Sequence, residues 1–274
     1  MTSVPVPEVD LRPQSVLLAF FGDYASEPGS VVAAASIFDV LEPAGVGSHA
    51  TRATVSRMVK RGLLHRVAEG RQAYFGLTGF GLRTVLEGRE RAQVADVVDR
   101  AWDGRWTLVG FSLPEASQRD RHLLRSRLTW AGFGMVQGGL WAAPHDVDVV
   151  ALLDDLDVLE HVTAFRGEPL APTETARMVA EAFDLESLAA RYAEFVERWA
   201  PTAASDDLEY PLTARVVLSA DWGIVLRGDP RLPLELLPEP WPALAARDLQ
   251  RALDKRLRRP AETEARKRLD VRAR

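Results

Sequence analysis

The segment from Ser48 to Thr78, SHATRATVSRMVKRGLLHRVAEGRQAYFGLT, constrains the fold more than any other part of the chain. Its first half predicts an amphipathic helix that begins at Ser48 as N-cap and ends at Gly62. Two short apolar runs then predict strands over Leu63 to Val67 and Gln72 to Leu77, joined by a turn at Glu69-Gly70-Arg71. A helix followed by a two-stranded hairpin is the element order of a winged helix-turn-helix.

The two sides of this helix differ in chemistry. The side expected to pack carries Thr51, Val55, Met58 and Val59, and the opposite side carries Ala50, Ala53, Ser56, Arg57 and Lys60. Small residues let a helix backbone approach base edges, and long cations reach bases or phosphates. We therefore expect this surface to bind double-stranded DNA. The predicted contact residues are Ser48, Ala50, Thr51, Arg52, Ala53, Ser56, Arg57, Lys60, Arg61, Arg66 and Arg71.

The charge distribution favours the same interpretation. The segment holds six Lys or Arg residues against Glu69 alone, although the whole chain has a net charge of −5. Positive charge concentrated in one segment of an acidic protein is typical of a nucleic-acid contact surface. The alternative is a solvated amphipathic helix followed by a hairpin. Within the DNA interpretation, we expect Arg57 to contact a base, Arg71 to contact phosphate, and Arg52 to hold phosphate or an internal carboxylate.

Flanking elements complete an N-terminal domain over residues 1–90, with a connector helix that runs from Gly79 to about residue 101. The apolar spacing after Arg12-Pro13 predicts a first helix that carries Leu17, Phe20, Phe21 and Tyr24. A second helix is expected from about Val31 to Leu41.

The next domain is expected over residues 102–170. Strands are predicted at residues 105–113, 133–137, 140–143 and 161–166, and helices at 115–131 and 147–156. The order βαββαβ, with a tight hairpin at Gly138-Gly139, is that of a ferredoxin-like antiparallel sheet.

The third domain, residues 171–274, is predicted to be helical with a basic tail. Helices are expected over 175–183, from Leu188 to a break at Pro201, over 212–222 and over 241–257. The proline-rich stretch 227–242 is expected to be an extended loop, and the tail 258–274 to be frayed. The fold class expected is therefore α+β.

Composition and motifs argue against several classes of function. No cysteine is present, the five histidines show no metal-ligand spacing, and the acids between Asp146 and Glu160 are interpreted as a solvated face, so no metal or cofactor is expected. No P-loop, GxSxG or strand-linked GxGxxG motif occurs, so we expect no enzyme activity. No apolar run is long enough to span a bilayer and no signal organisation is seen, which predicts a cytoplasmic protein with no membrane contact.

Five segments together resemble the PaaX family of transcriptional regulators. They are RPQSVLLAFFGDYA at 12–25, TRATVSRMVKRGLL with GRQAYFGLT at 51–78, WDGRWTLVGFSLPE at 102–115, WAGFGMVQGGLWAAP at 130–144 and DPRLPLELLPEPWP at 229–242. The resemblance implies a bacterial repressor of an aromatic or related catabolic operon, with a winged helix, a ferredoxin-like domain similar to small CRISPR adaptation nucleases, and a helical C-terminal domain. It also implies a homodimer released from its operator by an acyl-CoA thioester such as phenylacetyl-CoA.

The resemblance, together with the apolar and cationic side chains near these segments, also suggests where the effector binds. We expect a slot between the central and C-terminal domains, with indoles against an aryl group and arginines against phosphate. The predicted effector residues are Trp102, Arg105, Trp106, Trp141, Trp222 and Arg227. Core packing is the alternative role for each tryptophan.

The sequence departs from the family pattern at two places. The segment LSADWGIVL has Ala220 and Gly223 where relatives often carry His and Arg, so the effector is expected to differ. The strand that ends at Phe111-Ser112-Leu113 lacks the aspartate of the CRISPR nucleases, so no metal-dependent phosphodiester chemistry is implied. Two other functions remain alternatives: a non-catalytic nucleic-acid-binding adaptor and a nuclease-like enzyme.

Overall fold

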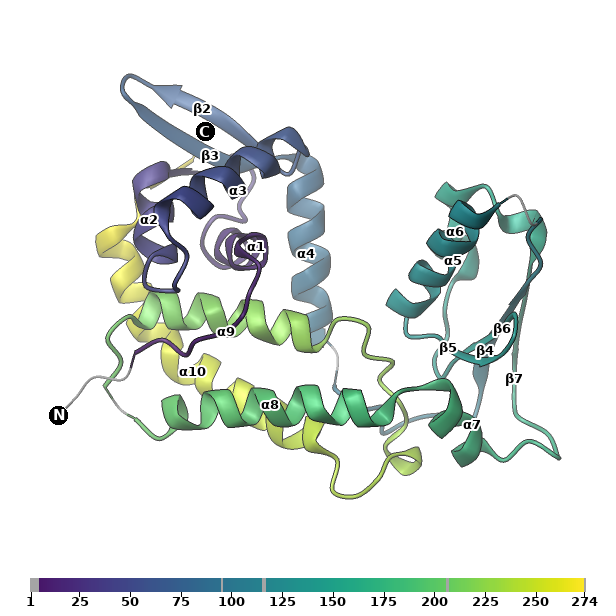
Figure 1. The fold of residues 1–274 in the computed structure, drawn as a ribbon. Helices are drawn as coiled ribbons and strands as arrows, with labels where there is room; N and C mark the ends of the chain where they lie inside the picture. The colour runs from purple at the N-terminus through teal and green to yellow at the C-terminus, as the bar shows by residue number, and fades with distance from the viewer. Residues whose placement is uncertain (1–4, 95, 115–116, 206, 274) are drawn as a thin grey trace. The chain divides into compact units, whose positions relative to one another are not determined.

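The computed structural model describes residues 5–94, 96–114, 117–205 and 207–273. It is a mixed α/β structure with two antiparallel four-stranded sheets (Figure 1). The chain forms two compact units that alternate along the sequence. The first unit comprises Met1–Ala95, Glu194–Val225 and Ala245–Arg274, and the second comprises Asp96–Ala193 and Leu226–Leu244. The division into three consecutive domains stays a prediction.

The first unit is built around helix α1 (Pro13–Tyr24), which contacts α2, α3, α4 and α9 (Figure 1). A proline in the first turn suits the start of this helix, because that position has no intrahelical partner for an N–H group. The predicted residues Leu17, Phe20 and Phe21 are buried in the core. The other elements of this unit include β1 (Val31–Ala33), α2 (Ala34–Leu41), α3 (Ser48–Lys60), β2 (Leu64–Glu69), β3 (Gln72–Leu77), α4 (Gly79–Val94), α9 (Pro211–Val225), α10 (Pro242–Arg268) and β8 (Val271–Arg272).

The sheet of this unit has the strand order β2-β3-β1-β8. Strand β1 occupies residues that the sequence assigned to the second helix, which begins at Ala34 instead. Its partners, β3 and β8, are far away in sequence, so local periodicity did not reveal it.

Two predictions about elements in the C-terminal part of the chain are wrong. Helix α8 (Leu185–Ala203) does not break at Pro201. A proline in the last turn removes only one hydrogen bond, and the Arg256 side chain donates to the last carbonyls of the helix, those of Thr202 and Ala203. The tail is not frayed either, because α10 continues to Arg268 and β8 then joins the sheet.

The second unit contains the predicted order of strands and helices. Its sheet has the order β5-β6-β4-β7, with every neighbouring pair antiparallel, and helices α5 and α6 pack on one face (Figure 1). The bounds are β4 (Trp106–Phe111), α5 (Gln118–Trp130), β5 (Gly134–Gln137), β6 (Leu140–Ala143), α6 (Val149–Leu153), the 3₁₀ turns Asp154–Leu156 and Leu159–His161, and β7 (Val162–Gly167). Helix α7 (Thr175–Ala182) and a 3₁₀ turn at Leu234–Leu236 follow. The predicted start of α5 at residues 115–116 lies outside the described residues.

The connector helix α4 ends at Val94 rather than near residue 101. Further along, the backbone of Asp99 is held by the proline-rich loop: its N–H donates to the Leu232 carbonyl and its carbonyl accepts from Leu234. These hydrogen bonds to a distant segment replace the helical ones that the local sequence favours.

Candidate nucleic-acid interface

Helix α3 has one buried side and one exposed, cationic side. Thr51, Thr54, Val55 and Met58 are buried, whereas the cationic side chains of the helix are exposed. The predicted contact residues that lie exposed on α3, at its end or on the hairpin are Ser48, Arg52, Ser56, Arg57, Lys60, Arg61, Arg66 and Arg71. The structure therefore brings most of the predicted contact residues together in one unit.

Three predictions at this helix need correction or qualification. Thr51 cannot contact DNA, because its side chain is fully buried and its hydroxyl donates to the Gly47 carbonyl at 3.2 Å. Ser48 is not the N-cap, since Gly47 occupies that position. Ala50 and Ala53 are half-buried at the edge of the exposed side, and Ala50 packs against the core.

Three of the cations are held in place by neighbouring side chains. The Arg57 guanidinium donates to the Thr54 hydroxyl at 2.8 Å, which fixes it against the helix. The Arg52 guanidinium lies 5.2 Å from the centre of the Phe38 ring, a cation–π contact, rather than beside an internal carboxylate. Arg61 donates to the Gln14 side chain at 3.3 Å.

The charge of these cations is not neutralised within the part of the chain that the structure describes. None of Arg52, Arg57, Lys60, Arg61, Arg66 and Arg71 forms an ion pair with a described residue. Arginines elsewhere, such as Arg127, Arg198 and Arg258, do face a carboxylate within 4 Å. Unpaired cations on one surface leave their charge available for phosphate.

The hairpin places Arg71 at its tip. Glu69 pairs with Gln72, so Gly70 and Arg71 form a two-residue turn. Gly70 has a φ of 58°, which a glycine at the first position of such a turn adopts without strain. Arg71 is exposed there, as predicted.

The C-terminal strand β8, which was not predicted from the sequence, supports this hairpin. The Arg272 guanidinium lies 2.7 Å from a Glu69 carboxylate oxygen and 4.6 Å from the centre of the Tyr74 ring. The Tyr74 hydroxyl in turn donates to Asp270 at 2.7 Å. The alternation of apolar and charged residues in Leu269-Asp270-Val271-Arg272 is a strand signal that was available in the sequence.

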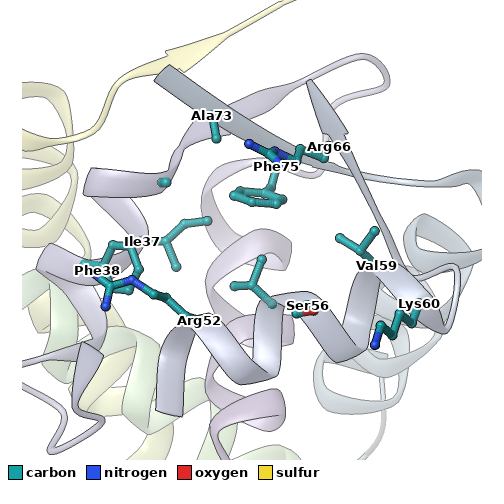
Figure 2. Close-up of a pocket in the computed structure, with 11 residues that line it drawn as sticks. Ile37, Phe38, Arg52, Ser56, Val59, Lys60, Arg66, Ala73 and Phe75 are labelled. Carbon is teal, nitrogen blue, oxygen red and sulfur yellow. The ribbon is translucent and has the colours of Figure 1, made fainter. Parts of the chain in front are cut away.

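An apolar groove lies between α3 and the hairpin. Its volume is about 580 Å³, and its apolar lining includes Ile37 and Phe38 of α2, Val55 and Val59 of α3, and Phe75 of β3. Figure 2 shows the Phe75 ring, Ile37 and Val59 around one open space, with Arg66 beside the Phe75 ring. No periodicity or motif in the sequence indicates this groove, because its lining residues come from separate segments.

Three of the six predicted effector residues are buried inside the unit to which each belongs. Trp106 and Trp141 are buried on opposite faces of the second sheet: Trp141 is opposite Val109 in the sheet, and Trp106 precedes Val109 by three positions on β4. Trp222 belongs to the first unit, where it is buried against Phe195 at a ring distance of 5.1 Å. These three tryptophans are core residues.

The other three predicted effector residues reach the surface. Trp102 is half-buried and meets Trp106 edge to face at 5.5 Å. Arg105 is exposed, and the exposed Arg227 stacks over the Trp130 ring at 5.4 Å.

In the described residues, no group of three or more His, Asp or Glu side chains is placed to hold a metal ion. No described helix has the length and apolarity needed to cross a membrane.

Comparison with known proteins agrees with the resemblance seen in the sequence. Three family models match in order: "PaaX-like protein" at residues 12–81, "PaaX protein central Cas2-like domain" at 99–179 and "PaaX-like protein C-terminal domain" at 183–267. The chain is 30% identical over 257 residues to the transcriptional repressor PaaX of Escherichia coli, covering 89% of this chain and 80% of that one. An uncharacterized protein from Mycobacterium tuberculosis has a similar fold, with a TM-score of 0.62 at 22% identity over 92% of this chain and 98% of that one. The chain belongs to the PaaX family.

Proposed function

We propose that this protein is a DNA-binding transcriptional repressor. In this proposal α1, α2, α3 and the β2–β3 hairpin form a winged helix, with α3 in the major groove and the hairpin against the phosphate backbone. The single observation that carries the proposal is the set of six cations on α3, at its end and on the hairpin, none of which has an ion-pair partner among the described residues. Burial of the apolar side of α3 leaves Arg52, Arg57 and Lys60 on the accessible side of the helix.

The division of labour among these cations follows from their positions. Arg57 projects from the exposed side of α3 in its last turn and is supported by Thr54, so we assign it to contact with a base edge. Arg71, at the tip of the hairpin, is placed for phosphate. Arg52 is oriented by its contact with Phe38 and flanks the base-contacting position.

The finer parts of the proposal concern assembly, the central domain and the effector. One winged helix buries too little surface for tight specific binding, so we expect a homodimer on a palindromic operator, with half-sites about 34 Å or a multiple of it apart. The β5-β6-β4-β7 sheet with α5 and α6 on one face supports a ferredoxin-like assignment of the central domain. An acyl-CoA thioester that relieves repression of an aromatic catabolic operon is the effector that the family resemblance favours. Trp102, Arg105 and Arg227 are its remaining candidate contacts.

The proposal is tested by fluorescence anisotropy with DNA from upstream of the protein's own gene and with unrelated DNA, across a series of salt concentrations. Arg57→Ala should weaken binding to the upstream DNA by about 5- to 150-fold, the equivalent of roughly 1–3 kcal/mol, with little change on unrelated DNA. Arg71→Ala should weaken binding to both and reduce the slope of log affinity against log salt by about 0.9.

Arg127→Ala is the matched control, because Arg127 is exposed, lies in the other unit and is already paired with Asp155. Its affinity for DNA should be that of the wild type. Equal binding of the wild-type protein to upstream and unrelated DNA at every salt concentration would refute sequence-specific repression.

A further inference from the structure

We propose that the groove between α3 and the hairpin is a binding site for an amphipathic anion, with an apolar body of about two fused rings and one carboxylate or sulfonate, and that its occupant competes directly with DNA. The binding part of this inference stands on the groove alone. The competition part rests on the proposed function.

The size and floor of the groove suit an apolar body. Its volume of about 580 Å³ lies within the range of roughly 300–1,000 Å³ that is common for small-molecule sites. The floor is formed by aliphatic and aromatic side chains from three elements, α2, α3 and β3. In Figure 2 the Phe75 ring and the Ile37 and Val59 side chains lie around the same open space. Filling that space would remove apolar surface from water at a gain of about 25 cal/mol per Å².

The charges around the groove select an anion. Arg52, Lys60 and Arg66 line it, and no acidic residue is among the lining residues. None of the three cations has an ion-pair partner among the described residues. A bound carboxylate or sulfonate would therefore form charge-assisted hydrogen bonds with groups that have no competing partner in the described chain, whereas a cationic ligand would be repelled.

The same side chains link the groove to DNA binding. Arg52, Ser56, Lys60 and Arg66 are both lining residues and predicted DNA contacts. An occupant that neutralises these cations removes phosphate contacts, and its bulk stands between α3 and the hairpin where DNA would approach. The apparent dissociation constant for DNA then rises in proportion to 1 + [ligand]/Kd, without any change of conformation.

The binding site is tested without DNA, by fluorescence titration with two probes that share one body. The anion is 8-anilinonaphthalene-1-sulfonate, and its neutral analogue is N-phenyl-1-naphthylamine. We expect one site per chain that binds the anion at least about 10-fold more tightly than the neutral analogue. Arg66→Ala should lower the affinity for the anion about 5-fold or more and leave that for the neutral probe unchanged. Arg71→Ala is the matched control on the same hairpin, because Arg71 does not line the groove, and should leave both affinities unchanged.

Two filling variants locate the site. Ala73→Trp places an indole in the groove from β3, and Ser56→Trp does so from the exposed side of α3, so that one variant remains informative if the other fails to fold. Either variant, once shown by circular dichroism to be folded, should abolish binding of both probes. Equal affinities for the two probes, or undiminished binding by a folded filling variant, would overturn the site.

Competition is tested separately by adding 8-anilinonaphthalene-1-sulfonate to the protein–DNA complex. The apparent dissociation constant for DNA should rise linearly with probe concentration, and Ala73→Trp should remove this dependence. A probe that fills the groove while DNA affinity stays constant would overturn the competition. Failure to bind DNA at all would refute the proposed function, and the titrations without DNA would still decide the site.

Discussion

Gly81 in helix α4 tests how closely the junction between the recognition helix and the hairpin is packed. A Cβ atom built on Gly81 would lie 2.0 Å from the backbone carbonyl oxygen of Leu63, and 3.2 Å from a Leu77 side-chain carbon. Leu63 joins α3 to β2, so Gly81→Ala requires the backbone of that junction to move by about 1.4 Å or more to reach ordinary contact. For Gly88, on the same helix, no described atom outside the adjacent helix backbone lies within 4 Å of an added Cβ.

Substitution by alanine is therefore expected to change the free energy of unfolding in opposite directions at Gly81 and Gly88. Overpacking costs up to about 3 kcal/mol, and the higher helix propensity of alanine offsets up to about 1 kcal/mol, so Gly81→Ala should lose a net stability of roughly 2 kcal/mol. Gly88→Ala should gain roughly 0.5–1 kcal/mol because only the helix-propensity effect remains.

Urea unfolding measured by circular dichroism gives the free energy of each variant, and the difference between the two should be near 3 kcal/mol. Affinity for DNA is the second measurement. It should fall in Gly81→Ala, because the α3–hairpin junction is displaced, and should not change in Gly88→Ala. A Gly81→Ala protein as stable as the wild type would refute the close approach of α4 to Leu63.

Three further predictions concern other parts of the chain. Asp221 is buried and accepts hydrogen bonds from Trp199 and a neighbouring arginine, so Asp221→Ala should cost about 3–5 kcal/mol in urea unfolding, far more than an exposed carboxylate. Burial lowers the pKa of His145 below 6.5. The neutral ring therefore stabilises the fold above pH 6.5, and this contribution is lost as pH falls through the lowered pKa. Between pH 7 and 5, the thermal midpoint of His145→Gln should fall less than that of the wild type. Arg272→Ala, which removes the contact with Glu69, should speed amide exchange in β8 and the hairpin without changing exchange in α1.

The sequence predicted those features that depend on local chemistry. The periodicity of α3 separates Val55 and Met58 from the exposed cations, and the glycine at position 70 marks a tight turn; the structure contains both. The strands at Gly134–Gln137 and Leu140–Ala143 agree with prediction to within one residue, because alternation and the Gly-Gly turn are encoded by neighbouring residues.

Other features were not predicted because they depend on partners that are far away in the sequence. Strand β1 is defined by its pairing with β3 and β8. The order of helix α8 past Pro201 depends on Arg256, and the order of the tail on the sheet that it joins. Chemistry alone could not tell a core tryptophan from one that contacts a ligand, so Trp106, Trp141 and Trp222 were assigned to an effector slot.

The sequence by itself determined which residues form the helix and the hairpin, where the positive charge is concentrated and which family the chain resembles, because these properties belong to runs of neighbouring residues. Only the tertiary structure decided that Thr51 is buried, that Arg272 contacts Glu69 beside the hairpin turn, and that α2, α3 and β3 enclose an apolar groove rimmed by cations. Each of these depends on packing between segments that are separate in the chain, and side-chain burial and long-range pairing are settled only when those segments meet.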